Sequence, residues 1–379
     1  LIGAEYQEFD YAQKLDPASE AGLVGGSSGW SNGGNREIAT LFMEYLLPVA
    51  DGTDISIAAR YDNYSDFGGT VTPSIGIVSS LTDSLTVRAR WGEGFAAPDM
   101  DELYGPSLQW RTFVYDPVQG VEWPVEAFSN SNEDLQPEES TSISAGFNWE
   151  YLDGHSLDIA YYRIEVEDVI TWPGLQSLAW ADAEGREWDP DGIRVVRSPS
   201  GYITEIHSVA TNADLQEASG VDVQLRSSFD TVAGMFDLGL VYSYQLSFKA
   251  NAYYQGSYQD LRNFLNRPDT RAQASIGWSR GDHSASVVLN YIGEHAVDED
   301  RDFQTGVIVP AEEMYDPWIS ASLAYRYDAG NLGQIRVGAN NVFDEDPALD
   351  PRFDVPAAAT LYDWTGRVIF VEYRNTFDW

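Results

Sequence analysis

Apolar and polar residues alternate along most of the chain. The stretch 85–91 shows this most clearly, with apolar side chains at every second position: Leu85, Val87, Ala89 and Trp91 against Thr86, Arg88 and Arg90. The same period of two recurs in further segments: 36–48, 54–61, 140–151, 220–229, 271–279, 283–291, 316–327, 333–343 and 367–379. Because successive side chains of a strand point to opposite faces, the pattern predicts about fourteen β-strands, each with one apolar and one polar face.

The connections between these predicted strands alternate between short and long. Short turns lie at 50–53, 82–83, 153–154, 230–234, 280–282 and 329–333; long polar connections lie at 93–138, 171–203, 249–266, 295–315 and 344–365. The connection at 65–69 belongs to the same end as the long ones but is short. A soluble antiparallel sandwich would show the same alternation of side chains, but it has no reason to place every long loop at one end. Outer-membrane barrels do so, with short periplasmic turns and longer extracellular loops. We therefore predict an all-β, antiparallel transmembrane β-barrel.

The aromatic residues follow the same polarity. Strands that run towards a long loop carry apolar-face aromatics near that loop: Tyr61, Trp91, Tyr291 and Phe343. Strands that run the other way carry them near the short turns: Tyr45, Phe147, Trp149, Phe229, Trp278, Tyr325, Phe377 and Trp379. Aromatics could instead fill a soluble core, but two girdles with aliphatic residues between them indicate a wall that faces a bilayer. Leu85, Val87, Ala89 and Trp91 should then face lipid, and the arginines that alternate with such residues should face a wet lumen: Arg60, Arg88, Arg90 and Arg226.

Composition narrows the choice of function. Hydrophobic residues make up 43% of the 379 residues, yet no run approaches the ~20 apolar residues that a membrane-spanning helix needs. The absence of Cys excludes thiol chemistry and cysteine-ligated metals. Sixty acidic residues against 22 basic ones give a formal net charge of −38, which excludes nucleic acid as a partner, because phosphate binding needs a basic surface. Such a charge indicates either solvated acidic loops or a collector of cations.

Few residues suggest covalent chemistry or metal binding. None of the four histidines shows a metal-ligand spacing, and a Ser–His–Asp arrangement is left open only because its members need not be adjacent. Acidic clusters lie in three predicted loops: 182–191, 294–303 and 344–354. None has the spacing of a calcium loop, so solvated loops are the favoured interpretation and a bound cation the minor one. We predict no enzyme activity, no resident metal and no cofactor.

Tryptophans in the two longest connections are candidates for solute binding. They are Trp110, Trp123, Trp172, Trp180 and Trp188. Exposed aromatic rings above a barrel can stack on sugars, peptides or aromatic ligands, and they can also pack the loops together. We expect the segments 93–136 and 171–203 to cover the barrel mouth. The candidate solute-binding residues are four of these tryptophans and three lumen arginines: Trp110, Trp123, Trp172, Trp180, Arg60, Arg88 and Arg90.

Five stretches, in order, resemble the TonB-dependent outer-membrane receptors. They are residues 60–105 (RYDNYSDFGGTVTPSIGIVSSLTDSLTVRARWGEGFAAPDMDELYG), 132–147 (NEDLQPEESTSISAGF), 217–229 (EASGVDVQLRSSF), 335–347 (IRVGANNVFDEDP) and 362–377 (YDWTGRVIFVEYRNTF). The resemblance implies that residues 1–379 are the C-terminal portion of a 22-stranded barrel. The family's N-terminal plug domain, the short box that engages its energy-transducing partner, and about eight strands are not in this sequence. Trp379 takes the place of the usual terminal Phe.

The resemblance also implies a function and its partners. It implies an outer-membrane receptor of a Gram-negative bacterium that takes up a scarce solute by active transport coupled to the TonB complex, which would engage the missing region. The solute could be a siderophore, a corrinoid, an oligosaccharide or a peptide. A passive porin-like channel is the alternative, and an outer-membrane enzyme the third. If the resemblance holds, the barrel contacts outer-membrane lipid, and the strand at 1–10 pairs with the receptor's N-terminal half rather than with 367–377.

Overall fold

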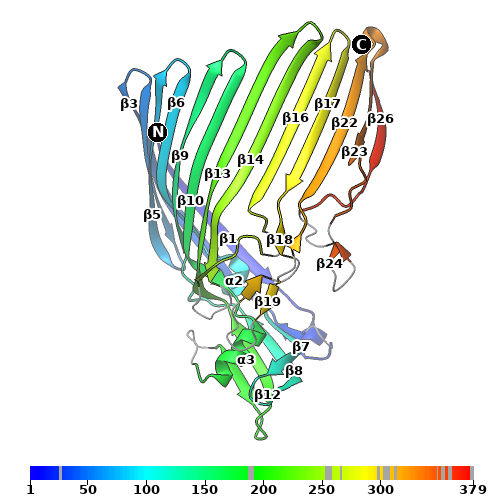
Figure 1. Cartoon of the computed structure of the whole chain (residues 1–379). Coiled ribbons are helices and arrows are strands. Elements are labelled where there is room, and N and C mark those ends of the chain that lie inside the picture. The colour runs from blue at the N-terminus through cyan, green and yellow to red at the C-terminus, as the bar shows by residue number, and fades with distance from the viewer. Residues whose placement is uncertain are drawn as a thin grey trace.

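The computed structural model describes eleven segments of the chain: 1–24, 28–186, 192–251, 258–264, 267–296, 299–301, 308–310, 314–347, 349–350, 355–356 and 361–375. Within them the chain is built mainly of antiparallel strands (Figure 1). No helix in these segments is long and apolar enough to cross a membrane.

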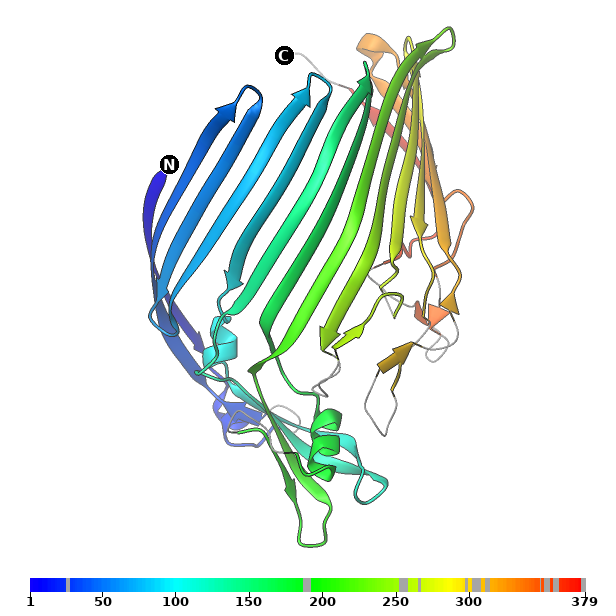
Figure 2. The same ribbon diagram turned by 60° about the vertical axis from the view of Figure 1, so that its left-hand side comes forward.

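Fourteen strands follow one another in chain order across a large antiparallel sheet, which confirms the predicted fold class. They are β1 (Ile2–Gln13), β3 (Asn32–Ala50), β4 (Thr53–Tyr64), β5 (Gly68–Thr82), β6 (Leu85–Ala96), β9 (Glu138–Leu152), β10 (His155–Thr171), β13 (Thr211–Thr231), β14 (Gly234–Asn251), β16 (Thr270–Arg280), β17 (His283–Ile292), β22 (Trp318–Asp328), β23 (Gln334–Asn340) and β26 (Val368–Arg374). A fifteenth strand, β15 (Tyr258–Asp260), pairs with the end of β14. The strands form a tilted, curved wall (Figures 1 and 2).

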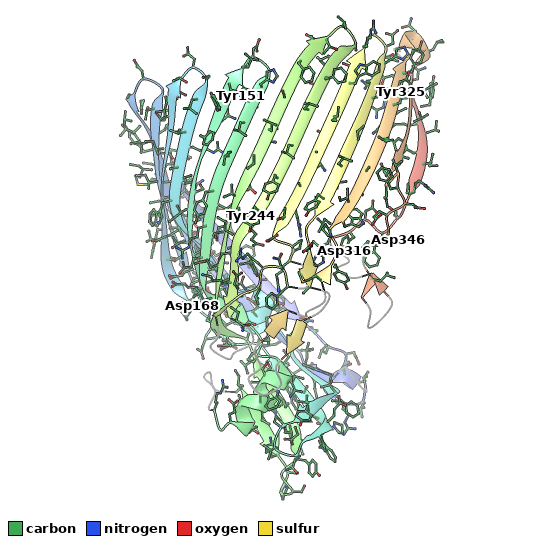
Figure 3. All side chains as sticks on the ribbon, viewed as in Figure 1. Tyr151, Asp168, Tyr244, Asp316, Tyr325 and Asp346 are labelled. Carbon is green, nitrogen blue, oxygen red and sulfur yellow. The ribbon has the colours of Figure 1, made fainter. Side chains whose placement is uncertain are left out.

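Tight turns and long connections lie at opposite ends of this wall. Both views show the hairpin turns along one rim and the irregular segments along the other (Figures 1 and 2). Side chains follow this polarity, with Tyr151 and Tyr325 near the turn rim and Asp168, Asp316 and Asp346 at the loop end (Figure 3). By the loop-length rule for outer-membrane barrels, the loop end is extracellular.

The strand register confirms the predicted separation of apolar and polar faces. Trp91 pairs with Ile75 on one side and Ile143 on the other, so these apolar side chains form one row across three strands. Arg90, one residue away, pairs with Gly76 and Ser144 on the opposite face. Nine of the predicted outward aromatics fall in apolar rows of this kind: Tyr45, Tyr61, Trp91, Phe147, Trp149, Phe229, Trp278, Tyr291 and Tyr325. The prediction for Phe343 was wrong, because β23 ends at Asn340 and Phe343 lies in the turn that follows. Phe377 and Trp379 lie outside the described residues.

The sheet is open. Within the described residues β1 pairs only with β3 and β26 only with β23, so the first strand does not close onto the last, as we predicted.

Two long connections that we predicted as polar loops, together with residues 28–30 from the link between β1 and β3, form a folded unit of their own. Five strands form a second sheet in the order β11 (Arg194–Arg197), β12 (Ile203–Val209), β8 (Val121–Asn130), β7 (Ser107–Asp116) and β2 (Ser28–Trp30). Strands β12 and β8 run parallel although they are about 80 residues apart in the chain. Helix α3 (Leu175–Ala183) packs on this sheet, and we call the sheet and helix together the loop domain. The second connection runs on to Ala210, beyond the predicted 203.

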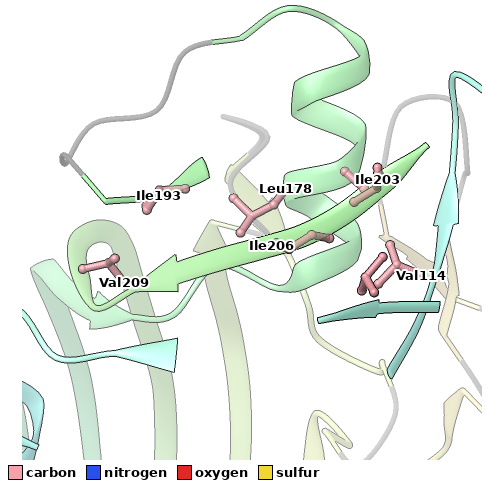
Figure 4. Close-up of a cluster of buried hydrophobic side chains, with 8 residues drawn as sticks. Val114, Leu178, Ile193, Ile203, Ile206 and Val209 are labelled. Atoms are coloured by element: carbon pink, nitrogen blue, oxygen red, sulfur yellow. The ribbon is translucent and has the colours of Figure 1, made fainter. Parts of the chain in front are cut away.

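The loop domain has a hydrophobic core of its own. Buried apolar side chains from β7, β8, α3, β12 and the residue before β11 meet there: Val114, Val125, Leu178, Ala179, Ile193, Ile203, Ile206 and Val209 (Figure 4). Leu178 and Ile203 are fully buried. Helix α3 is short and follows Trp172-Pro173-Gly174, and this core rather than its helix propensity stabilises it. The domain lies beyond the extracellular rim of the wall (Figures 1 and 2).

Shorter elements complete the described chain. They are α1 (Pro17–Glu20), α2 (Met100–Tyr104), a 3₁₀ turn (Gly330–Leu332) and three two-stranded ribbons, β18 (His295–Ala296) with β21 (Met314–Tyr315), β19 (Glu299–Arg301) with β20 (Ile308–Pro310), and β24 (Leu349–Asp350) with β25 (Val355–Pro356).

Candidate functional site

The lumen face and the extracellular end of the wall form the candidate site. Three lumen arginines were named as candidate solute-binding residues, and two of them are already paired with carboxylates. Arg60 contacts Asp62 at 2.7 Å, and Asp62 is fully buried. Arg88 donates two hydrogen bonds to Asp158, at 2.7 and 2.8 Å. Arg90 is exposed on the same face, and no ion pair within the described chain engages it. The wall therefore presents much less positive charge to a solute than its arginine count suggests.

Arg36 is a positioning residue at the mouth that the sequence did not reveal. Its side chain is buried, contacts Asp66 at 2.7 Å and donates to the backbone oxygen of Pro98 at 2.8 Å. Its guanidinium also lies over the rings of Tyr64 and Phe67, at 5.4 and 5.9 Å. These contacts join the tip of the β4–β5 hairpin to the start of the connection after β6. A single arginine in a strand of alternating apolar and polar residues gives no indication of these contacts.

Three of the predicted tryptophans belong to the loop domain: Trp110 on β7, Trp123 on β8 and Trp180 on α3. The ring of Trp123 is 38% exposed and stacks on Tyr202 with 4.4 Å between ring centres. Trp180 lies 5.9 Å from Tyr115, and its indole N–H is buried with no partner in the described residues. Trp172, 39% exposed, follows β10 at the rim. Trp188 lies outside the described residues.

The structure thus divides the predicted site between two places. The arginines are on the barrel wall, and three tryptophans are in the loop domain beyond it. No hydrogen bond or ring contact between the two sets occurs in the described part of the chain. Trp123 and Trp172 present exposed ring surface, whereas Trp110 and Trp180 are half-buried in the loop domain.

A buried ion network fixes the far end of the loop domain. Asp116 is fully buried and contacts Arg197 at 2.9 Å, and Arg197 contacts Asp182 at 2.7 Å. Burial acts to raise the pKa of Asp116. Hydrogen bonds from Arg197 and from the backbone N–H of Ile203 outweigh that effect, and the pKa of this carboxyl lies below its ordinary range. The carboxylate therefore stays ionised and holds β7, β11 and β12 together.

A second buried cluster lies where β17 and β22 meet their loops. His295 is fully buried, with its Nε2 3.2 Å from the Tyr362 hydroxyl and its ring beside Tyr315. Burial lowers the pKa of His295 and raises the pKa of Tyr362 to about 12. Trp318 packs edge-on against Tyr362, with ring centres 5.6 Å apart. The cluster ties residues 361–362 to the end of β17 in a neutral environment.

Next to this cluster, a cavity of about 450 Å³ opens on the lumen face. Neutral polar side chains from three adjacent strands line it. Gln273 on β16 donates to Asn290 on β17 at 2.9 Å, and Asn290 donates to Ser320 on β22 at 3.3 Å. The three are register partners within three residues of their strands' extracellular ends. The sequence analysis did not single them out, because polar residues at alternating positions are expected along every lumen face.

The described residues contain no group of three or more His, Cys, Asp and Glu side chains placed to hold a metal ion. The acidic segments 182–191, 294–303 and 344–354 are only partly within the described chain.

Comparisons with known proteins agree with this architecture. The family described as TonB dependent receptor-like, beta-barrel, matches residues 1–342. The vitamin B12 transporter BtuB of Vibrio vulnificus strain YJ016 is 26% identical over 296 residues, which is 76% of this chain and 35% of that protein. The ferric enterobactin receptor PirA of Pseudomonas aeruginosa is 27% identical over 206 residues, 48% of this chain and 26% of that protein. The chain therefore spans about a third of the length of these curated relatives.

Solved structures share the fold. A mutant of the ferric enterobactin receptor PfeA from Pseudomonas aeruginosa aligns with a TM-score of 0.72 at 17% identity, covering 98% of this chain and 50% of that one. The siderophore receptor PirA from Acinetobacter baumannii aligns with a TM-score of 0.68 at 17% identity, covering 98% and 51%. Homologues of this type are outer-membrane receptors of Gram-negative bacteria, and this β-sheet is likewise a part of an outer-membrane protein. The chain belongs to the TonB-dependent receptor β-barrel family.

Proposed function

We propose that this chain is the C-terminal portion of a receptor that imports a scarce solute across the outer membrane by TonB-dependent active transport. The observation that carries the proposal is the family match over residues 1–342, on a sheet whose lumen face carries polar and charged side chains such as Arg88, Arg90 and Ser144. The relatives named above are transport receptors rather than enzymes, which supports a role without covalent chemistry.

The open edges of the sheet support a partner within the same receptor. Each unsatisfied backbone group costs several kcal/mol in hydrocarbon, so strands in a bilayer must form a closed barrel. We infer that β1 and β26 pair with the remaining strands of an N-terminal half, which also supplies the plug. The TonB complex would act on that half.

The functions of the relatives indicate the range of solutes. BtuB is a vitamin B12 transporter, and the Pseudomonas protein is a receptor for ferric enterobactin. A corrinoid and an iron chelate are therefore the first two classes to test, with oligosaccharides and peptides behind them. The exposed rings of Trp123 and Trp172 supply aromatic surface for first contact in any of these cases.

Uptake measured with and without energy coupling tests the proposal. Cells that express the full-length receptor should accumulate labelled solute above the external concentration, and removal of the TonB protein should abolish the accumulation. Equilibration without accumulation, unchanged by loss of TonB, would instead identify a passive channel. Replacing Trp123 and Trp172 with Ala should weaken capture if they contact the solute, and unchanged affinity would assign them to loop packing.

A further inference from the structure

A row of neutral polar side chains crosses three lumen strands just below the extracellular loops. Gln273, Asn290 and Ser320 are linked by hydrogen bonds of 2.9 and 3.3 Å. Each amide has two donors and an acceptor with two lone pairs, so these two hydrogen bonds leave the Gln273 oxygen and further N–H groups available. The row faces a cavity of about 450 Å³, within the range of small-molecule sites.

Apolar surface completes the wall of the same cavity. Trp318, the register partner of Ile292, lines it with only 7% of its surface exposed. Its indole nitrogen has almost no accessible surface, so the ring contributes a side wall and not a donor. Small-molecule sites combine such apolar walls with a few polar groups that orient the ligand.

The charges around the cavity set the class of that ligand. Arg271 and Asp363 lie on its wall with opposite signs, so the lining has no net charge. The neighbouring Ser243 hydroxyl donates to Asp222 at 2.6 Å, which adds a carboxylate beside the cavity. An iron complex of deprotonated catecholates carries negative charge, and the one cation on this wall, Arg271, is offset by the carboxylates of Asp363 and Asp222.

We propose that this cavity is a solute-binding subsite that selects neutral solutes rich in amide or hydroxyl groups over anionic iron chelates. The inference rests on the proposed transport function and specifies its substrate class. Gln273 and Asn290 would exchange hydrogen bonds with the solute's carbonyl, amide or hydroxyl groups, and the Trp318 ring would pack against its apolar surface. Corrinoids with their peripheral amides and oligosaccharides with their hydroxyls share this chemistry.

Equilibrium binding to the purified full-length receptor tests the subsite. The probes are cyanocobalamin, a maltooligosaccharide and ferric enterobactin, and the variant is the double change Gln273→Ala with Asn290→Ala. Gln334→Ala is the matched control, because Gln334 lies on the same lumen face of β23 at the periplasmic end. We expect one neutral probe to bind, the double variant to weaken it about tenfold, and the control to leave it within about twofold.

Three results would overturn the inference: binding of the neutral probe unchanged by the double variant, equal losses in the double variant and in Gln334→Ala, or tight binding of ferric enterobactin with no binding of either neutral probe. Each variant is first shown to be a folded barrel by its heat-dependent shift on a gel. The proposed function fails separately, if uptake of the bound solute persists unchanged without TonB.

Discussion

Asp116 illustrates how single buried charges stabilise the extracellular part of this chain. The carboxylate is fully buried and accepts hydrogen bonds from Arg197 at 2.9 and 3.0 Å and from the Ile203 backbone at 3.2 Å. Arg197 reaches Asp182 as well, so one arginine links β7, β11 and the end of α3. Neither partner could be chosen from sequence, because 81 residues separate them.

Asp116→Asn should destabilise the loop domain while leaving the barrel intact. Removal of one partner of a buried ion pair lowers the free energy of unfolding by about 3–5 kcal/mol. We expect the lower end of that range, because Arg197 would still be paired with Asp182. Hydrogen exchange at Val125 and Ile206 of the full-length receptor would report the loss. The matched control is Glu184→Gln, which removes a surface pair with Arg186 and should cost less than about 1 kcal/mol. Equal effects of the two variants would contradict the assigned role of Asp116.

His295 should make the adjoining loops sensitive to acid. Burial lowers the pKa of this imidazole from its ordinary 6.5, so the folded cluster holds it neutral. The opened loops take up a proton at higher pH than the closed ones, and stability is therefore complete above about pH 6.5 and is lost progressively as pH falls below it. Exchange rates of residues 293–296 and 361–363 should rise over that range. His295→Gln should flatten the dependence, and a slope that survives this change would contradict the explanation.

At the scale of elements, the period of two was sufficient to predict the barrel strands. A lipid-facing and a lumen-facing side alternate without exception over segments such as 85–91, and burial imposes no competing pattern. We did not predict the loop domain, because the sequence patterns of its strands and helix are weaker. Pro124 interrupts the alternation of β8, α3 is only nine residues long, and the parallel pairing of β8 with β12 depends on contacts distant in sequence.

The candidate site, too, could be predicted only in part from the sequence. The faces of Arg60, Arg88 and Arg90 followed from periodicity. Asp62 lies two residues from Arg60 on the same face of β4, so that ion pair was within reach of the pattern although we did not predict it. Asp158, the partner of Arg88, is 70 residues away and could not be chosen from the pattern. The polar row of Gln273, Asn290 and Ser320 depends on the register of three strands. Such register is fixed by cooperative pairing across the sheet and not by any one segment.

Adjacent residues of β13 provide a direct test of face assignment. Leu225 lies on the apolar face, where it pairs with Leu157 and Leu240, and Gln224 lies on the lumen face beside Asp158. Leu225→Arg should destabilise the barrel by about 2–4 kcal/mol, whereas Gln224→Arg should have little effect. Folding into lipid vesicles at graded urea concentrations would measure both. Similar losses for the two variants would overturn the register.

At the scale of the whole molecule, the sheet is a wall with two open edges and a strongly acidic chain. The net charge of −38 disfavours anionic solutes unless local arginines are free. We propose that this wall is one part of a larger barrel and not a channel that closes on itself. These 379 residues contain no Cys, so none of them competes with engineered pairs at the two edges.

Oxidative cross-linking across the edges is the most direct measurement. Tyr6 on β1 pairs with Ala39 on β3, so Tyr6→Cys with Ala39→Cys should form a disulfide in the full-length receptor and serves as the positive control. Tyr6→Cys combined in turn with cysteine at Ile369, Val371 or Tyr373 of β26 should give no intramolecular disulfide, because further strands separate the two edges. Efficient cross-linking of any β1–β26 pair would show that the fourteen strands close on themselves, and would contradict the account.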